Sequence, residues 1–134
     1  MPFTRISMNR ELFETHQQEV SVILQQCLET YFDVPKGDCF QLFDVHSQQQ
    51  KVFDKYYPDL TEGRNDAGIL FHIFAGKPRS QEQKRALYKA LCECLVQRTN
   101  INKEDVMVIL QFNNREDWSF SSGLSASDIK GNIK

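Results

Sequence analysis

Val34-Pro35-Lys36-Gly37-Asp38 and Ile101-Asn102-Lys103-Glu104-Asp105 are two related stretches of the chain, and the second begins sixty-seven residues after the first. The same spacing relates Cys27 to Cys94. It is half the length of the 134-residue chain. We therefore expect a tandem repeat, in which two similar units are joined head to tail.

Two segments show the periodicity of amphipathic helices. Apolar residues recur at helical spacing from Val20 to Tyr31 and again from Leu87 to Leu95. Ser80 followed by Gln83 is a capping-box signature, which predicts that the second helix begins there. Each half is therefore expected to contain one helix.

Strands are expected at residues 3–8, 39–46, 68–75 and 106–112. A β-α-β unit with a right-handed crossover then occupies each half, at about 1–67 and 68–134, and residues 113–134 form a C-terminal tail. The predicted fold class is α+β (α/β type). It is a single domain over 1–134, with a four-stranded sheet and two helices on one face of it.

The other face of this sheet is expected to be apolar and uncovered. Two helices cannot cover every apolar strand residue, a set comprising Phe40, Leu42, Phe71, Ile73, Val108 and Leu110. Association with identical subunits would bury the remainder.

Composition excludes several function classes. A net charge of -2 gives no basic surface for nucleic acid. The longest apolar stretch, Ile69 to Ala75, is too short to span a membrane. Cys92 and Cys94 form a C-x-C rather than a C-x-x-C pair, and the histidines lack metal-ligand spacing. We expect a reduced cytoplasmic protein without a metal or cofactor.

The chain begins Met1-Pro2, and an initiator methionine before proline is usually excised. Excision would make the Pro2 nitrogen a secondary amine. An α-amino group titrates nearer to neutral pH than a lysine does, which suits proton transfer. Because the predicted strand follows at once, this amine would be held rigidly. The alternative is that the Met-Pro start has no functional meaning.

Gly76-Lys77-Pro78-Arg79-Ser80 leads from a strand into the second helix. Two cations before a helix N-terminus suit a small carboxylate or phosphate, although a solvated basic loop is an equal alternative. Lys77 lies at the far end of its strand from the residue equivalent to Pro2. A site that includes both therefore requires antiparallel neighbouring strands or a second subunit.

Three further residues are candidates with structural alternatives. Asp38 is suited to an acid/base role, but its position in a turn also explains it. Trp118 and Phe120 are suited to walling an apolar pocket or to pinning the tail onto the core.

Three motifs carry a family resemblance: Val34-Pro35-x-x-Asp38-x-Phe40-Gln41, Pro78-Arg79-Ser80-x-Glu82-Gln83-Lys84 and Asp117-Trp118-Ser119-Phe120. With Pro2 and the repeat, they resemble the tautomerase superfamily, and within it the malonate semialdehyde decarboxylase branch. The likeness extends from Pro2 to about Gly123.

The resemblance implies a homotrimer in which Pro2 is the catalytic amine, Asp38 activates water and Arg79 binds the substrate carboxylate. Lys77 stands where the decarboxylase has a second arginine, and Cys39 replaces a basic residue. Both departures weaken the case for malonate semialdehyde as the substrate.

The expected function is a cofactor-independent enzyme acting on a small oxo acid or enol carboxylate. A neutral Pro2 would act as the base of a tautomerase, and a protonated Pro2 as the acid of a decarboxylase or hydratase. The alternatives are a catalytically silent trimer that binds a partner, and a small-anion sensor that uses Lys77 and Arg79.

Overall fold

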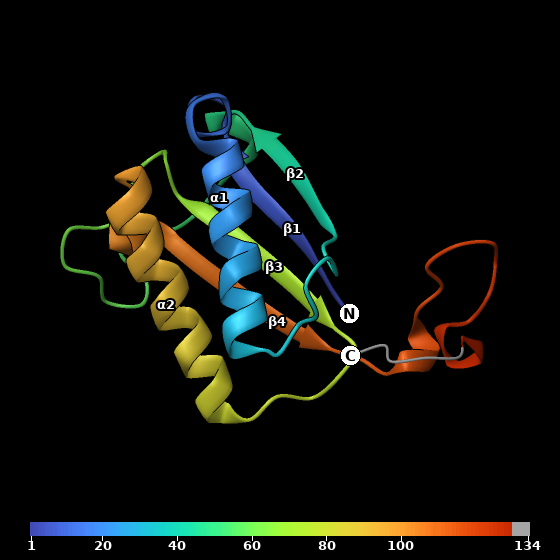
Figure 1. Ribbon diagram of the computed structural model, residues 1–134. Coiled ribbons are helices and arrows are strands. Elements are labelled where there is room, and N and C mark those ends of the chain that lie inside the picture. The colour runs from blue at the N-terminus through green and yellow to red at the C-terminus, as the bar shows by residue number, and fades with distance from the viewer. Residues whose placement is uncertain (130–134) are drawn as a thin grey trace.

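The structure, a computed structural model, describes residues 1–129. Its main elements are β1 (Pro2–Asn9), α1 (Arg10–Tyr31), β2 (Gln41–His46), β3 (Ile69–Ala75), α2 (Gln81–Thr99) and β4 (Val106–Phe112). The strands form one sheet in the order β2-β1-β3-β4, and both long helices lie on the same face of it (Figure 1). The predicted fold class is confirmed.

The sheet consists of two parallel β-α-β units that meet at its centre. β1 pairs with β2, and β3 pairs with β4, both in parallel. β1 and β3 are antiparallel, with Pro2 opposite Ala75. The antiparallel arrangement required for a site that combines Pro2 with the segment after β3 is therefore present.

The core lies between the sheet and the helices. Every second residue of β1 and β3 points towards the helices, as the pleat of a strand dictates. Ile6 from β1 and Phe71 from β3 are fully buried there. Each helix contributes the apolar stripe expected from its sequence, which includes Leu24 of α1 and Leu91 of α2.

The helix α1 begins well before its apolar stripe. The Asn9 side chain accepts the Leu12 N–H at 2.7 Å and caps the helix. The first half of α1 is largely polar, so the apolar periodicity indicated only its second half.

The six apolar strand residues named from the sequence divide between the two faces of the sheet. Phe71 and Ile73 are fully buried against the helices, and Val108 and Leu110 also pack against the core. Leu42 lies on the open face, where it is 46% exposed, and Phe40, which directly precedes β2, is 45% exposed, so the helices do not cover all six residues. The pairing register, which decides the face on which each residue lies, cannot be read from the sequence.

Polar pairs interrupt the apolar residues of the open face. Arg5 donates to both carboxylate oxygens of Asp44 at 3.0 Å, and His72 forms a hydrogen bond with Gln111. The apolar residues that share this face of the sheet with the polar pairs are Phe3, Leu42, Leu70, Phe74, Met107 and Ile109. This face is mixed rather than uniformly apolar.

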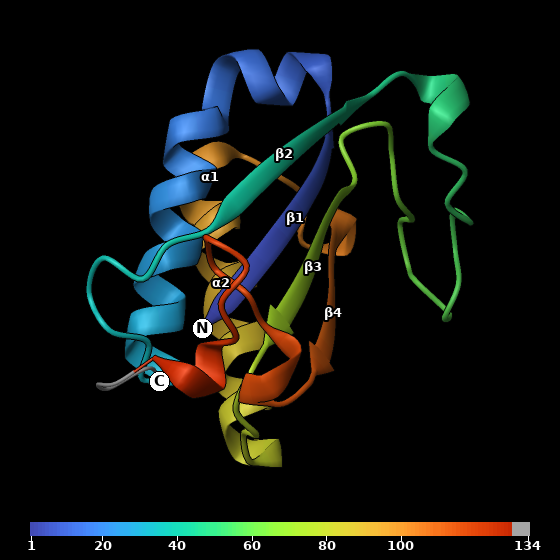
Figure 2. The same cartoon turned by 90° about the vertical axis from the view of Figure 1, so that its right-hand side faces the viewer.

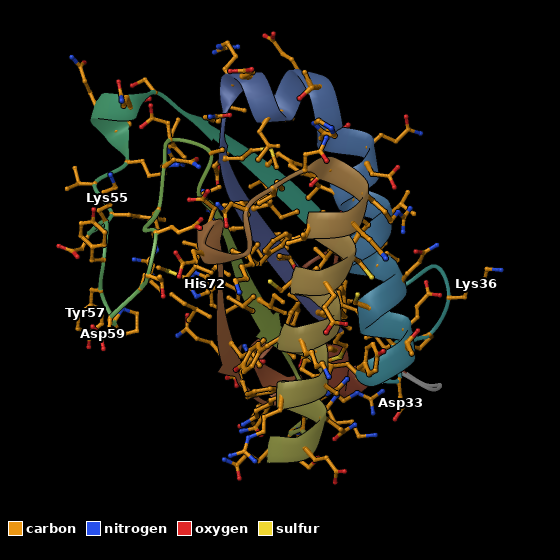
Figure 3. The ribbon with its side chains drawn as sticks, turned by 90° about the vertical axis from the view of Figure 1, so that its left-hand side faces the viewer. Asp33, Lys36, Lys55, Tyr57, Asp59 and His72 are labelled. Atoms are coloured by element: carbon orange, nitrogen blue, oxygen red, sulfur yellow. The ribbon has the colours of Figure 1, made fainter. Side chains whose placement is uncertain are left out.

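The connector between β2 and β3 forms an arm that projects from the sheet, with Tyr57 and Asp59 at its tip (Figure 3). The Glu104 carboxylate anchors it by accepting three backbone N–H groups, those of Thr61, Glu62 and Gly63, at 2.8–3.0 Å. The arm lies far from Asp33 and Lys36, which mark the loop after α1 on the other side of the molecule (Figure 3).

The segment after β4 folds back beside the start of β1 and the end of β3 (Figure 2). It contains two short 3-10 turns, Arg115–Asp117 and Ala126–Asp128. The tail therefore adjoins the N-terminus of the chain. Over residues 1–129, no helix has the length and apolar character needed to cross a membrane.

Candidate active site

The N-terminus lies in a buried position at the end of the sheet. Met1 is only 4% exposed, and Pro2 opens β1 opposite the last residue of β3. The Met1 amino group donates a hydrogen bond to Asp38 Oδ2 at 2.6 Å. The structure thus brings the start of the chain and Asp38 together.

Asp38 reaches the N-terminus because the chain turns sharply between α1 and β2. Its N–H donates to Pro35 O at 3.0 Å. Gly37 adopts a φ of +90°, which glycine tolerates best. Beyond the turn, Phe40 O accepts the Thr4 N–H at 3.0 Å and fixes the segment to β1. The Asp38 side chain remains 18% exposed, so solvent reaches its carboxylate.

Gly76 forms one wall of this site. Its N–H donates to Met1 O at 3.3 Å. A Cβ at this position would overlap Met1 Cε and would lie 3.0 Å from Trp118 Nε1. Gly76, Met1 and Trp118 are therefore in direct contact, and a larger residue at position 76 would displace one of them.

Aromatic residues from the tail form a second wall. Trp118 stacks on Phe120, and Phe120 contacts Phe40, each at a centroid separation of 5.6 Å. The Trp118 Nε1–H donates to Asn113 Oδ1 at 2.6 Å, and the Asn113 N–H donates to Ala75 O at 3.0 Å. These contacts fix the indole against the end of β3, so Trp118 and Phe120 pin the tail, and Trp118 borders the N-terminal site beside Gly76.

Arg79 uses much of its guanidinium within the protein. Its Nε and Nη2 donate to Phe32 O at 3.1 and 2.7 Å, and its Nη1 donates to Lys77 O at 2.5 Å. It also lies over the Phe32 ring at 5.1 Å. Burial lowers the pKa of Arg79, and the nearby Asp33 partly offsets this effect.

Arg79 therefore caps the C-terminal end of α1 and orders the turn that contains Lys77. Three of its five N–H groups bind carbonyl oxygens. Lys77 directly follows Gly76 and is exposed. The two predicted cations thus lie on the segment that leaves the site, Lys77 towards solvent and Arg79 half-buried.

A surface pocket of about 320 Å³ adjoins the aromatic wall on the open sheet face. It is lined by Phe3, Arg5, Phe74, Asn113, Asp117 and Trp118. Trp118 lines this pocket and also lies beside Gly76, so the indole borders both the pocket and the N-terminal site.

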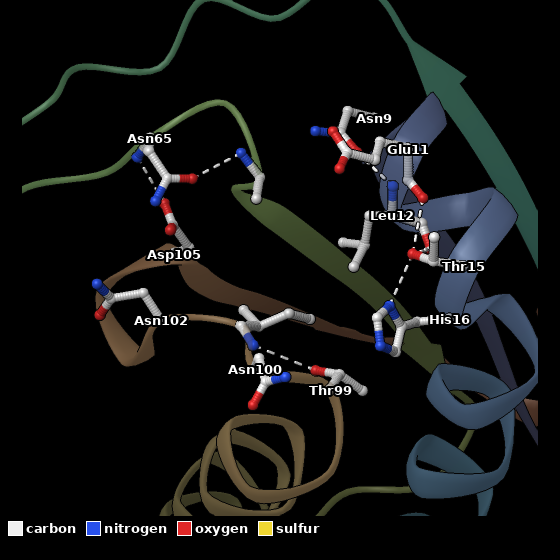
Figure 4. A pocket seen from close by; sticks show the side chains of 12 residues that line it. Asn9, Glu11, Leu12, Thr15, His16, Asn65, Thr99, Asn100, Asn102 and Asp105 are labelled. Atoms are coloured by element: carbon white, nitrogen blue, oxygen red, sulfur yellow. Dashed lines mark hydrogen bonds between the residues drawn. The ribbon is translucent and has the colours of Figure 1, made fainter.

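A second pocket, of about 360 Å³, lies at the opposite end of the sheet beside Asp105 (Figure 4). Asp105 is the repeat equivalent of Asp38, but it is only 1% exposed. Its Oδ1 accepts the Asn65 N–H at 2.8 Å, whereas Oδ2 has no hydrogen-bond partner among the described residues. Burial raises the pKa of Asp105, and Lys51 acts in the opposite direction.

Over residues 1–129, no group of three or more His, Cys, Asp or Glu side chains is arranged to hold a metal ion. Sequence reasoning did not identify Gly76 or Asn113 as site residues. The only available signal for Gly76 was its place between a strand and two cations. Asn113 acts through one hydrogen bond to an indole, which no sequence pattern indicated.

Comparison with known structures places the chain in the tautomerase superfamily. A solved structure of malonate semialdehyde decarboxylase superposes with a TM-score of 0.82 at 27% identity, covering 91% of this chain and 92% of that one. A fused 4-OT symmetric trimer superposes with a TM-score of 0.74 at 16% identity, covering 93% and 96%, and thus supports the fold alone.

Sequence comparison gives the family. Residues 38–121 match the model of the family described as Tautomerase enzyme. The probable tautomerase YusQ of Bacillus subtilis (strain 168) is 32% identical over 123 residues, which is 92% of this chain and 95% of YusQ. The chain therefore belongs to this tautomerase family.

Proposed function

We propose that the chain, once Met1 is removed, is a cofactor-independent acid/base enzyme that acts on a small oxo acid or enol carboxylate through the Pro2 amine. The observation that carries this proposal is the ion pair between the N-terminal amine and Asp38 at the start of β1. Removal of one residue moves the terminal nitrogen by at most about 3.6 Å, so the new amine stays in the same site.

Each candidate residue has a role in the proposed reaction. As a neutral amine, Pro2 takes the proton from the enol oxygen and returns a proton to the neighbouring carbon, which gives a tautomerase. As a protonated amine, it polarises the substrate carbonyl while Asp38 positions water, which gives a decarboxylase or hydratase. Asp38 remains solvent-accessible, as both roles require.

The carboxylate of the substrate is proposed to bind at the turn after β3. Lys77 supplies an exposed positive charge directly beside Gly76. Arg79 retains part of its guanidinium for an anion, because carbonyl oxygens bind only three of its N–H groups. Trp118 and Phe120 would exclude water from the side of the tail.

We also propose that the protein is a homotrimer in a reducing, cytoplasmic environment. The apolar residues on the open sheet face would be buried by identical subunits, and the fused 4-OT structure of the same fold is a symmetric trimer. All four cysteines are free, which supports the proposed compartment.

A chain that retains Met1 would correspond to the silent alternative. Its Pro2 nitrogen is a tertiary amide, which neither donates nor accepts a proton at neutral pH. Met1 also fills the site beside Asp38 and Gly76. Catalysis is therefore proposed only for the processed chain.

The proposal is tested with processed wild-type protein and the processed Pro2→Ala variant. The assay is ketonisation of 2-hydroxy-2,4-pentadienoate, followed across pH, with malonate semialdehyde decarboxylation in parallel. We expect the variant to lose roughly 10²-fold or more of kcat/KM, because the secondary amine and its fixed geometry are lost. Equal pH-rate profiles for the two proteins would contradict the proposal.

A further inference from the structure

The pocket beside Asp105 is formed by three segments that are far apart in the sequence. Leu12 and His16 come from the start of α1, Asn65 comes from the end of the arm, and Asn102 comes from the loop between α2 and β4 (Figure 4). Its volume of about 360 Å³ is in the range of pockets that bind small molecules. It lies at the opposite end of the sheet from the N-terminal site.

The repeat relates this pocket to the surroundings of Arg79. An offset of sixty-seven residues makes Thr99 the counterpart of Phe32 and Leu12 the counterpart of Arg79. In the first half, Arg79 donates to Phe32 O through Nε and Nη2. In the second half, Thr99 and Leu12 both line the pocket, and leucine has no group to donate. The pocket is therefore bordered by the counterparts of a carbonyl and a cation that bind each other in the first half.

The C-terminal end of α2 faces this pocket without a cation of its own. Thr99 ends the helix, and Asn100 follows it as the cap. The last carbonyl groups of a helix carry partial negative charge and favour cations. No described residue donates to Thr99 O. Arg98, the basic residue of the last turn, instead donates to the side chains of Glu19 and Gln26.

Asp105 provides a buried acceptor at the same pocket. It is 1% exposed, and its Oδ1 accepts the Asn65 N–H, whereas no described residue donates to Oδ2. The nearby Lys51 uses Nζ to bind the carbonyl oxygens of Asp66 and Gly68 rather than this carboxylate oxygen. A buried oxygen without a donor is costly and uncommon. A ligand with N–H groups would supply the missing donor.

The charge of the pocket selects the class of ligand. Glu11 and Asp105 are its acidic lining residues, and among the described residues that line it none is Lys or Arg. A carboxylate or phosphate would be repelled, and a neutral polyol would leave both charges unmatched. A guanidinium group has five N–H donors and no acceptor, which matches a carboxylate and free carbonyl oxygens.

We infer that the pocket beside Asp105 binds a small guanidinium compound, which has the role in the second half that Arg79 has in the first. The guanidinium donates to the Asp105 carboxylate and to the carbonyl end of α2, and the exposed Glu11 adds negative charge at the rim. The inference is independent of the Pro2 amine, because the pocket lies at the other end of the sheet. An arginine side chain of another protein has the same chemistry, so the test separates these two sources.

The first test compares two ligands that differ in charge. Butylguanidinium and butylurea have the same chain and a similar planar head, but only the first is a cation. In calorimetric titrations we expect butylguanidinium to bind about tenfold or more tightly than butylurea, because charge-assisted hydrogen bonds are roughly twice as strong as neutral ones. Affinity should be the same with and without Met1. Equal binding of the two compounds, or no binding of either, would overturn the inference.

The position of binding is measured by amide NMR of ¹⁵N-labelled protein in the same titration. We expect the largest shift changes at Asn65, Thr99 and Asn102, which line the pocket. Changes centred on Gly76 and Trp118 would place the ligand at the N-terminal site and overturn the inference.

Two substitutions test the acidic residues. Asp105→Asn keeps the shape of the side chain and an acceptor oxygen but removes the charge, and we expect affinity for butylguanidinium to fall about tenfold. Because Asp105 is buried, Glu11→Gln provides a second variant at an exposed position, with an expected loss of about threefold. The matched control is Glu14→Gln, an exposed residue of α1 that pairs with Arg10 at 3.9 Å, and it should bind as wild type does. Wild-type affinity in both Asp105→Asn and Glu11→Gln would overturn the inference.

The source of the guanidinium is tested with acetyl-Gly-Arg-Gly-amide. The pocket is proposed to hold a free compound, so this peptide should bind no more tightly than butylguanidinium. Binding of the peptide about tenfold more tightly would overturn that assignment and indicate an arginine side chain of a partner protein.

Discussion

The two repeat halves place equivalent aspartates in contrasting environments. Asp38 in the first half is 18% exposed and binds the terminal amine of the chain. Asp105 in the second half is 1% exposed and accepts the backbone N–H of Asn65. The first site lies where the chain begins, whereas at the second the chain continues through Gly68 into β3.

A lysine provides the positive charge near the second aspartate. Lys51 Nζ donates to Gly68 O and Asp66 O, each at 2.8 Å, and its charge opposes the raised pKa of Asp105. Lys51 belongs to the arm rather than to the strand. The same local fold therefore holds a terminal amine beside the aspartate in the first half, and a backbone N–H beside it in the second.

Among the substitutions that compare the two aspartates, Asp38→Asn in the processed chain is expected to have the largest effect on turnover. The amide keeps the shape of the side chain but cannot carry the negative charge that faces the amine. We expect kcat/KM to fall by roughly 10²-fold or more, with little change in melting temperature because Asp38 is partly solvated. Loss of stability without loss of turnover would assign Asp38 to the turn alone.

Asp105→Ala is expected to show the reverse pattern. The substitution leaves the Asn65 N–H without its acceptor in a buried place, which costs about 1–3 kcal/mol of unfolding free energy. Turnover per folded molecule should be unchanged, because Asp105 lies at the other end of the sheet. Urea unfolding together with activity normalised to folded protein measures both effects, and a specific loss of turnover would contradict the assignment.

A smaller effect is expected in the pH dependence of stability. Since burial raises the pKa of Asp105, the folded state binds more protons than the unfolded state between the two pKa values. The contribution of this residue to stability therefore falls as pH rises from the unfolded to the folded pKa. The side chain of the Asp105→Asn variant cannot ionise. As pH rises through that range, the unfolding free energy of the variant should therefore increase relative to that of the wild type.

Unfolding free energies of both proteins, measured across the acidic range, test this expectation. A constant difference between them would show that Asp105 has the same pKa in the folded and unfolded states. The same unfolding measurements on the Asp38→Asn variant allow the aspartates of the two repeat halves to be compared directly.

Features governed by short-range patterns could be predicted from the sequence. The repeat, the capping box at Ser80 and the order of strands and helices all appear in the structure. Asp38 lies beside the N-terminus as the family resemblance implied. These features depend on local periodicity and on motifs whose spacing is preserved.

Features that depend on strand register and on backbone contacts could not be predicted from the sequence. The hydrophobic pattern did not separate the strand residues that face the helices from those on the open face, and the register places Phe71 and Ile73 in the core. The Phe32 carbonyl that binds Arg79 carries no side-chain signal. Gly76 contacts Met1 through its backbone N–H and through the space left by its missing side chain. Neither contact could be predicted without knowing that Met1 packs against this glycine.

The most direct test of the central claim follows one preparation through processing. Protein that retains Met1 is treated with methionine aminopeptidase, and intact mass and ketonisation of 2-hydroxy-2,4-pentadienoate are recorded together. If the Pro2 amine is the catalytic group, activity should rise from near zero in proportion to the fraction of chains that have lost one methionine. Equal activity before and after complete removal of Met1 would contradict the claim.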